Sequence, residues 1–204
     1  MSDDVQQLTK QPLTVVFFGI QGSGKGTQSR LLQGYLERNA DVPSLYLEMG
    51  ERLRGFATGA GFASKKVGET LNTGSLLPAF IPSHIITSFF LQEFTGREHV
   101  IVDGVARRIE QAVVLDEALA FFGREDYHTI VLDLPRDVAV ERMKGRGRSD
   151  DDDQKIERRL AWYESETLPA IQEIERRGRR VHHISGCPSV EEVHQQILSA
   201  LSLA

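Results

Sequence analysis

Gly19-Ile20-Gln21-Gly22-Ser23-Gly24-Lys25-Gly26-Thr27 directly follows the apolar run Val15-Val16-Phe17-Phe18. A segment of helix-forming composition, from Gln28 to Arg38, comes next. A buried strand, a glycine-rich turn and a helix in this order are typical of a phosphate-binding loop. Glycines let successive backbone N–H groups curl around an anion, the helix directs its positive end to the same point, and Lys25 adds a cation. The pattern predicts that the loop binds a nucleoside triphosphate.

Two other interpretations of this loop fit the residues less well. An ordinary tight turn would not require three glycines interleaved with a lysine. The spacing of a dinucleotide-binding turn fails because Thr27 stands where the third glycine belongs. The generic phosphate loop has Ser or Thr directly after the lysine, whereas here Gly26 intervenes and the hydroxyl comes at Thr27. This variant of the loop restricts the protein families to which the chain can belong, but the loop alone does not distinguish a kinase from a GTPase or an ATPase.

Length and composition set further bounds. The 204 residues, 40% of them hydrophobic, predict one domain with small insertions. A net charge of −5 and a pI near 5.7 argue against a nucleic-acid-binding surface. Cys187 is the single cysteine, which excludes an internal disulfide and a paired-cysteine zinc site. Residues 1–12 read as a flexible polar tail, neither secretory signal nor anchor, and no apolar run is long enough to span a membrane. We expect a cytoplasmic monomer with small-molecule partners, no nucleic acid and no membrane.

The rest of the chain alternates short apolar runs with segments of helical periodicity. This alternation predicts a doubly wound α/β fold around a five-stranded parallel sheet. The expected strands are Leu13–Phe18, Ser44–Leu47, His99–Val102, Thr129–Leu134 and Arg180–Ile184. A long helix is expected over Gln154–Arg177, with Trp162 and Tyr163 as packing groups.

Two segments interrupt the alternation within the predicted domain of residues 13–204. Residues of about 48–80 contain no strand-like run and are punctuated by glycines, which predicts a small helical insertion that moves as a unit. The second segment, about 145–154, contains an arginine-rich turn followed by four aspartates at Asp150 to Asp153. It is short, and the family resemblance given below implies that it forms a small lid.

The positions of the arginines in the sequence are the second strong indication of function. Several arginines follow the ends of predicted strands, and in an open α/β sheet ligands bind outside the carboxyl ends of the strands. Arginine forks make bidentate, permanently charged contacts, and a phosphoryl group in transfer needs positioning and charge neutralisation above all. The arrangement predicts a clamp for a second phosphorylated molecule, formed by Arg54, Arg107, Arg142, Arg146, Arg148 and Arg159.

At this point the motifs, taken in order, resemble the adenylate kinase family of nucleoside monophosphate kinases, in a form with a short lid. The resemblance extends from about Val15 to Val193. The segments that carry it are residues 19–28, 50–54, 103–112, 142–146 and 148–151, with Arg159, Leu160 and Tyr163 after them.

The resemblance implies reversible transfer of the terminal phosphoryl group of MgATP to a nucleoside monophosphate, giving two diphosphates. Lys25 would hold the transferring phosphates together with the backbone of Gly22, Ser23, Gly24, Gly26 and Thr27. Arg142 would stack on the ATP base and contact phosphate, while Arg146, Arg148 and Arg159 would surround the moving group. Asp103 would orient waters on Mg²⁺, because this cation keeps much of its hydration shell. Glu51 stands where the family usually has aspartate, and a water-mediated role in holding Mg²⁺ is expected for it.

The acceptor side is also implied by the resemblance. The residues expected there are Gly50, Arg54, Leu76, Leu77, Gly104, Arg107 and Gln111, with Arg54 and Arg107 gripping the monophosphate. Glutamine at position 111 favours AMP, since pyrimidine-directed relatives usually carry asparagine there. Met49 replaces a usual threonine, and Val105-Ala106 replaces a usual Phe-Pro. These departures leave three alternatives open: a pyrimidine (UMP/CMP) kinase, a kinase of broad acceptor choice, and a nucleotide-binding regulator with weak turnover.

Overall fold

The computed structural model describes residues 12–145 and 152–204. Within these ranges, five parallel strands form one sheet in the order β2-β3-β1-β4-β5. The first strand is central, and the chain crosses from one half of the sheet to the other after β3. The strands are β1 (Thr14–Gly19), β2 (Ser44–Glu48), β3 (His99–Asp103), β4 (His128–Asp133) and β5 (Arg180–Ser185).

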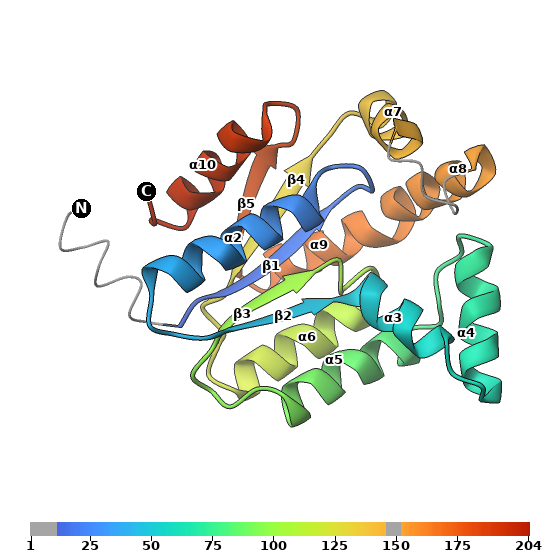
Figure 1. The fold of residues 1–204 in the computed structure, drawn as a ribbon, viewed down its shortest axis with the longest axis horizontal. Helices are drawn as coiled ribbons and strands as arrows, with labels where there is room; N and C mark the ends of the chain where they lie inside the picture. The colour runs from blue at the N-terminus through green and yellow to red at the C-terminus, as the bar shows by residue number, and fades with distance from the viewer. Residues whose placement is uncertain (1–11, 146–151) are drawn as a thin grey trace.

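Helices cover both faces of the sheet (Figure 1). Helices α2 and α10 lie on one face, and α5, α6 and α9 lie on the other. The helices are α2 (Lys25–Asn39), α3 (Met49–Ala57), α4 (Phe62–Asn72), α5 (Phe80–Gln92), α6 (Ile109–Phe121), α7 (Arg136–Gly145), α8 (Asp153–Trp162), α9 (Leu168–Arg176) and α10 (Val190–Ala200). Among the described residues, no helix is both long enough and apolar enough to cross a lipid bilayer.

The two-residue period of β1 explains why the sheet is covered on both sides. Val15 and Phe17 are buried in the cluster under α2 and α10, whereas Val16 and Phe18 are buried in the cluster under α5, α6 and α9. A strand whose side chains are apolar on both faces requires a helical layer on each. The doubly wound parallel fold predicted from the sequence is therefore confirmed.

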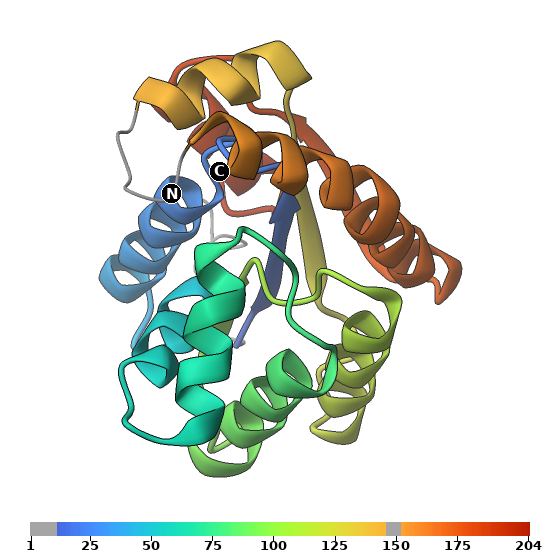
Figure 2. The same ribbon diagram turned by 90° about the vertical axis from the view of Figure 1, so that its right-hand side faces the viewer.

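Two helical arms extend from the carboxyl edge of this sheet (Figure 2). One arm contains α3 and α4, between β2 and α5, and lies within the predicted insertion. The other contains α7 and α8, which pack together through Ala139, Met143, Ile156 and Leu160. Whether the segment 48–80 moves as a unit stays a prediction. The predicted tail of residues 1–12 and the central part of the predicted lid lie outside the described residues, except for Pro12.

The predicted strands are each displaced from the observed ones by no more than one residue at either end. The long helix predicted over Gln154–Arg177 is wrong in one respect. A π-helical turn, η1 (Tyr163–Thr167), separates α8 from α9. This wider turn shifts the phase of the side chains, and it lies beside the carboxyl edge of the sheet, where π-bulges are often functional.

Candidate active site

The phosphate loop lies between β1 and α2, as the sequence predicts. Gly22 and Gly24 have φ values of +87° and +94°, which side chains rarely adopt. A Cβ on Gly22 would also lie 2.9 Å from the carbonyl oxygen of Ala139, so the loop and α7 are in close contact. The Lys25 ammonium donates hydrogen bonds to the carbonyl oxygens of Gly19 and Ile20, at 2.7 and 2.8 Å. The cation is thereby held over the loop at the positive end of α2.

The end of β3 brings Arg107 to the same edge. Asp103 is paired in register with Phe17 of β1, and the chain then turns at Gly104, which has a φ of +63°. The Arg107 Nε donates to the Gly104 carbonyl at 3.1 Å. Burial lowers the pKa of the Arg107 guanidinium to about 10, so it stays charged at neutral pH. The strand register thus places a cation opposite the phosphate loop.

Gln111 supports this turn from the first turn of α6. Its side chain is only 2% exposed. Its Oε1 accepts a hydrogen bond from the Arg107 backbone N–H at 2.8 Å. Thr167 of η1 fixes the other side of Arg107, because its hydroxyl donates to the Arg107 carbonyl at 3.3 Å. Gln111, for which the family resemblance implies a contact with the acceptor base, thus holds the backbone that carries Arg107.

The Asp103 carboxylate lies beside the start of α2. A Cβ on Gly26 would lie 3.4 Å from Asp103 Oδ2. The Tyr46 hydroxyl donates to the same oxygen at 3.3 Å and lies 2.8 Å from Ser29 Oγ. Burial raises the pKa of the Asp103 carboxyl, and the charge of Lys25 opposes this rise. An oxygen donor held next to a phosphate loop suits a hydrated Mg²⁺ ion, which prefers carboxylate and water ligands.

The acidic residue paired in register with Asp103 is Glu48, and the water-mediated role expected of Glu51 stays a prediction. Glu48 pairs with Asp103 across β2 and β3, and its carboxylate lies 3.3 Å from Arg54 Nη2. Glu51 is 67% exposed at its side chain, and its carboxylate pairs with Arg30 at 3.4 Å. Sequence reasoning missed Tyr46 and Glu48 because only the register of the parallel strands brings them beside Asp103.

The remaining residues that are expected on the acceptor side fall into two groups. Arg54 is exposed on α3 and close to Gly50, since its Nη1 lies 3.0 Å from where a Cβ on that glycine would be. Leu77 is buried in the cluster that also contains Met49 and Val105, and Leu76 is half-buried. The position that usually holds threonine in the family is therefore occupied here by a side chain of the core.

Arg142, which is expected on the donor side, extends from α7 toward the loop after β5. Its guanidinium donates to the carbonyl oxygens of Gly186 and Cys187, at 2.8 and 3.5 Å. Arg159 of α8 is buried. Arg146 and Arg148, which the sequence also assigns to the clamp, lie outside the described residues.

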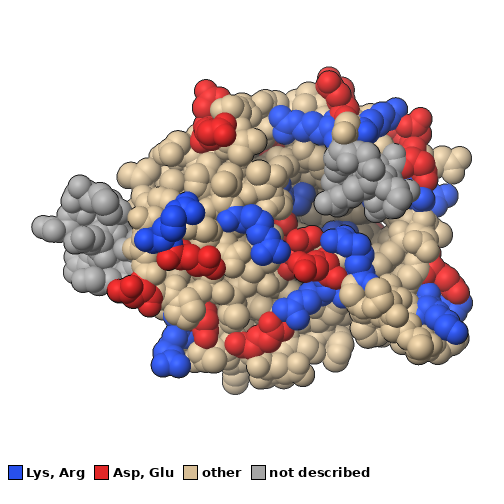
Figure 3. All heavy atoms as spheres, viewed as in Figure 1, with Lys and Arg blue, Asp and Glu red and all other residues tan. Residues whose placement is uncertain are grey.

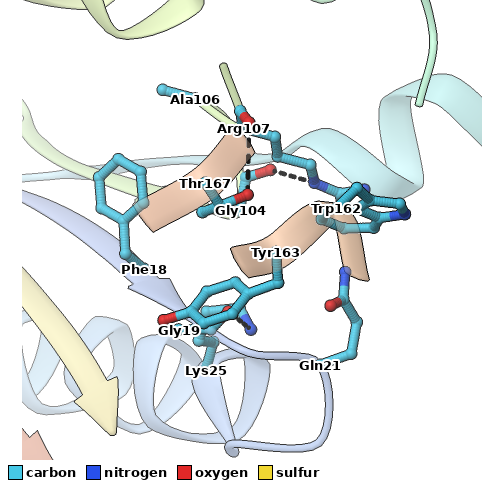
Figure 4. Close-up of a pocket in the computed structure, with 10 residues that line it drawn as sticks. All are labelled: Phe18, Gly19, Gln21, Lys25, Gly104, Ala106, Arg107, Trp162, Tyr163 and Thr167. Atoms are coloured by element: carbon cyan, nitrogen blue, oxygen red, sulfur yellow. Dashed lines mark hydrogen bonds between the residues drawn. The ribbon is translucent and has the colours of Figure 1, made fainter. Parts of the chain in front are cut away.

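Several of these groups line one pocket, shown in Figure 4. Lys25 and Arg107 reach it from opposite sides, from the loop after β1 and the loop after β3. Trp162 and Tyr163 close it at the junction of α8 and η1. Tyr163 also packs against the apolar side chains of α7 and α8, as expected of a packing group, and burial raises its pKa to about 12. The position of Trp162 at the pocket was missed, because a π turn leaves no periodic signal in the sequence.

The surface around this edge carries both signs of charge. On the face in Figure 3, lysine and arginine side chains alternate with aspartate and glutamate rather than forming a basic stripe. This mixture of charges is consistent with arginines that act individually, rather than as one continuous basic surface.

Comparison with known proteins agrees with this geometry. Residues 17–179 match the sequence profile of the family described as adenylate kinase. The chain is 31% identical over 191 residues to an adenylate kinase of Prochlorococcus marinus, covering 92% of this chain and 98% of that protein. It is 31% identical to an adenylate kinase of Corynebacterium glutamicum (93% and 99% covered) and 32% identical to one of Phocaeicola vulgatus (93% and 98% covered). With the phosphate loop, the sheet order and the profile in agreement, the chain belongs to the adenylate kinase family of nucleoside monophosphate kinases.

Proposed function

We propose that the protein reversibly transfers the terminal phosphoryl group of MgATP to AMP, giving two molecules of ADP. The observation that carries this proposal is one pocket, at the carboxyl ends of β1 and β3, that is lined by both Lys25 and Arg107. Binding one triphosphate needs the loop and its lysine. A second cation, fixed on the opposite wall by Gly104 and Gln111, has a use when a second anionic substrate meets the first.

In this scheme the protein contributes position and charge. The phosphate loop and Lys25 hold the donor phosphates, and Arg107 with Arg54 holds the acceptor phosphate in line with them. Arg142 and Arg159 neutralise charge from the lid arm, together with Arg146 and Arg148. Because the transferred group carries its charge on oxygens, fixed guanidinium groups stabilise the transition state without a covalent intermediate on the protein.

Magnesium fits the residues present. Asp103 would hold the ion through its waters, and the Tyr46 hydroxyl fixes the direction of the Asp103 carboxylate. Glu48 and Glu51 are the further carboxylates at this edge, Glu48 by register and Glu51 from the first turn of α3. When bound, Mg²⁺ supplies charge neutralisation to the donor phosphates. Burial raises the pKa of the Asp103 carboxyl, and the charge of Lys25 opposes that rise and so favours the ionised state that a cation requires.

AMP is the acceptor we favour. Gln111 is buried on the acceptor side, where an amide can pair with the adenine edge, and the chain's relatives are named adenylate kinases. Met49 is buried in the core, so its thioether leaves one side of the base pocket without a hydroxyl. That observation favours, as the second candidate, a kinase that also accepts other monophosphates. We further propose that the segments of about 48–80 and 145–154 close over the substrates, and that the enzyme is a cytoplasmic monomer.

The test is a product analysis. Purified protein is incubated with MgATP and equal concentrations of AMP, CMP, UMP or GMP, and the nucleotides are separated and quantified. We expect equal loss of ATP and AMP and formation of two ADP for each ATP consumed. Turnover of AMP alone removes the broad-acceptor candidate, and faster turnover of CMP or UMP removes the assignment to AMP. Binding of ATP with no transfer to any of the four would leave the chain as a nucleotide-binding regulator.

A further inference from the structure

Trp162 contacts a charged residue on the wall of the pocket. The Arg107 guanidinium carbon lies 5.2 Å from the centroid of the indole ring, within the range of cation–π attraction (Figure 4). The indole is half-buried, whereas its neighbours Leu160 and Tyr163 are buried. Its face is therefore used by a cation at the pocket, and it is not simply a part of the apolar cluster below α8.

The other end of the same side chain reaches a different part of the chain. The Trp162 indole Nε1 donates to the carbonyl oxygen of Gly74 at 3.2 Å, across 88 residues of sequence. Gly74 is buried and follows α4, in the segment that carries the acceptor-side residues. One side chain thus touches both the arginine expected to hold the acceptor phosphate and the arm expected to enclose the acceptor.

Two further residues of α8 contact the same turn. Arg158 donates from Nη1 to the Thr73 carbonyl oxygen at 2.9 Å. A Cβ on Gly74 would lie 3.2 to 3.4 Å from Lys155 Cβ, Cγ and Cα, so the backbone is packed closely on that lysine. Positions 155, 158 and 162 are three and four residues apart and so share one face of the helix. Thr73 caps the carboxyl end of α4, where unpaired carbonyls attract a cation.

We propose that Trp162 is a positioning residue for the acceptor monophosphate. Its ring face orients the Arg107 guanidinium, and its N–H, together with Arg158, fixes the Thr73–Gly74 turn against α8. Docking of the acceptor-binding arm and orientation of the phosphate-holding arginine are therefore coupled through one side chain. This inference rests on the proposed function, since it assigns the residue a part in acceptor binding.

Substitutions can separate the two contacts. Trp162→Phe keeps an aromatic face for Arg107 and loses the N–H, whereas Trp162→Ala loses both. Arg158→Ala removes the second bond to the turn and leaves the ring in place. The matched control is Arg176→Ala, an exposed arginine of α9 whose recorded ion pair is with Glu173 on the same helix.

Steady-state kinetics with the preferred monophosphate give the first readout. We expect Trp162→Phe and Arg158→Ala to raise the acceptor KM by roughly 3- to 10-fold with kcat within about twofold, because each loses one hydrogen bond that fixes the arm. Trp162→Ala should show the same rise and, in addition, a fall in kcat of about 10-fold, since Arg107 is no longer oriented. The KM for ATP should not change in any of them, and Arg176→Ala should match the wild type.

The second readout needs no variant. Trp162 is the only tryptophan of the chain, so protein fluorescence excited at the indole band reports on the surroundings of this one side chain. Titration of the wild-type protein with AMP in the absence of ATP should give a saturable change in emission, because a phosphate held by Arg107 changes the charge beside the indole ring.

The inference is overturned if AMP leaves the emission unchanged, or if Trp162→Ala keeps the acceptor KM and kcat within twofold of the wild type. These outcomes are distinct from a failure of the proposed function. If the wild type transfers phosphoryl to no monophosphate, the proposed function fails, and the emission titration with AMP still tests the contact. If the wild type is active and the variants are unaffected, only the role of Trp162 fails.

Discussion

Replacement of Arg107 by alanine tests the pocket at its best-defined residue. The Arg107 guanidinium donates a hydrogen bond to the Gly104 carbonyl. The backbone N–H of Arg107 donates to the Gln111 side chain, and its backbone carbonyl accepts from the Thr167 hydroxyl. A fixed cation of this kind costs little reorganisation when charge develops on the transferring group, and losing it costs about 3–5 kcal/mol of transition-state stabilisation. At 1.36 kcal/mol per tenfold, kcat/KM for the acceptor should fall by roughly 100- to 5,000-fold.

The assay couples ADP formation to NADH oxidation, with ATP saturating and the acceptor varied. Arg107→Lys keeps the positive charge without the planar guanidinium fork, so its kcat/KM for the acceptor should be about tenfold higher than that of Arg107→Ala. The thermal midpoint of each variant is the control for folding, since the backbone contacts of residue 107 do not depend on its side chain. A fully folded Arg107→Ala protein with kcat/KM within fivefold of the wild type would refute the assignment of this residue to the acceptor phosphate.

Three further predictions concern other parts of the molecule. Lys25→Met should reduce turnover by several orders of magnitude, on the scale of about 3–5 kcal/mol, with the far-ultraviolet circular dichroism unchanged; near-wild-type turnover would contradict the role of the loop. Asp116 is buried and accepts hydrogen bonds from Tyr127, Arg177 and Arg179 beside the amino end of β4, away from the pocket. Asp116→Ala should lower the free energy of unfolding measured in urea by about 2–4 kcal/mol, because the half-buried Arg177 and Arg179 lose their carboxylate partner. The kcat should stay within threefold of the wild type. An unchanged urea midpoint would count against this network. Burial lowers the pKa of His99 to about 4, below its usual 6.5, so the unfolded chain binds the proton more tightly. The stability that neutral His99 provides is complete above pH 6.5 and is lost as the pH falls toward 4, by about 2 kcal/mol between pH 7 and 4.5, and His99→Gln should flatten that slope in urea titrations.

The sequence predicts the strands well because of their position in the fold. Strand β1 is buried on both faces, so its apolar run is continuous, and its end is marked by the first glycine of the phosphate loop. The same logic places Lys25 and Arg107, because each follows directly after a central strand. Residues that act from the end of a buried parallel strand are the ones that a linear pattern can identify.

Residues placed by register or by irregular helix geometry could not be identified in this way. Tyr46 lies 57 residues before Asp103 in sequence, and only the pairing of β2 with β3 brings its hydroxyl to that carboxylate. Trp162 reads as one more position of a long amphipathic helix. The π turn that follows it, and the contact of α8 with Gly74, give it another environment.

We propose that one pocket holds the donor and acceptor phosphates end to end, between Lys25 and Arg107. This proposal is tested most directly by calorimetric titration with two adenosines joined through a five-phosphate bridge, a molecule that spans both subsites. We expect binding at one molecule per chain, competition with both ATP and AMP, and weaker binding in Lys25→Met and in Arg107→Ala alike. Binding of two molecules per chain, or affinity that depends on Lys25 and is indifferent to Arg107, would contradict it.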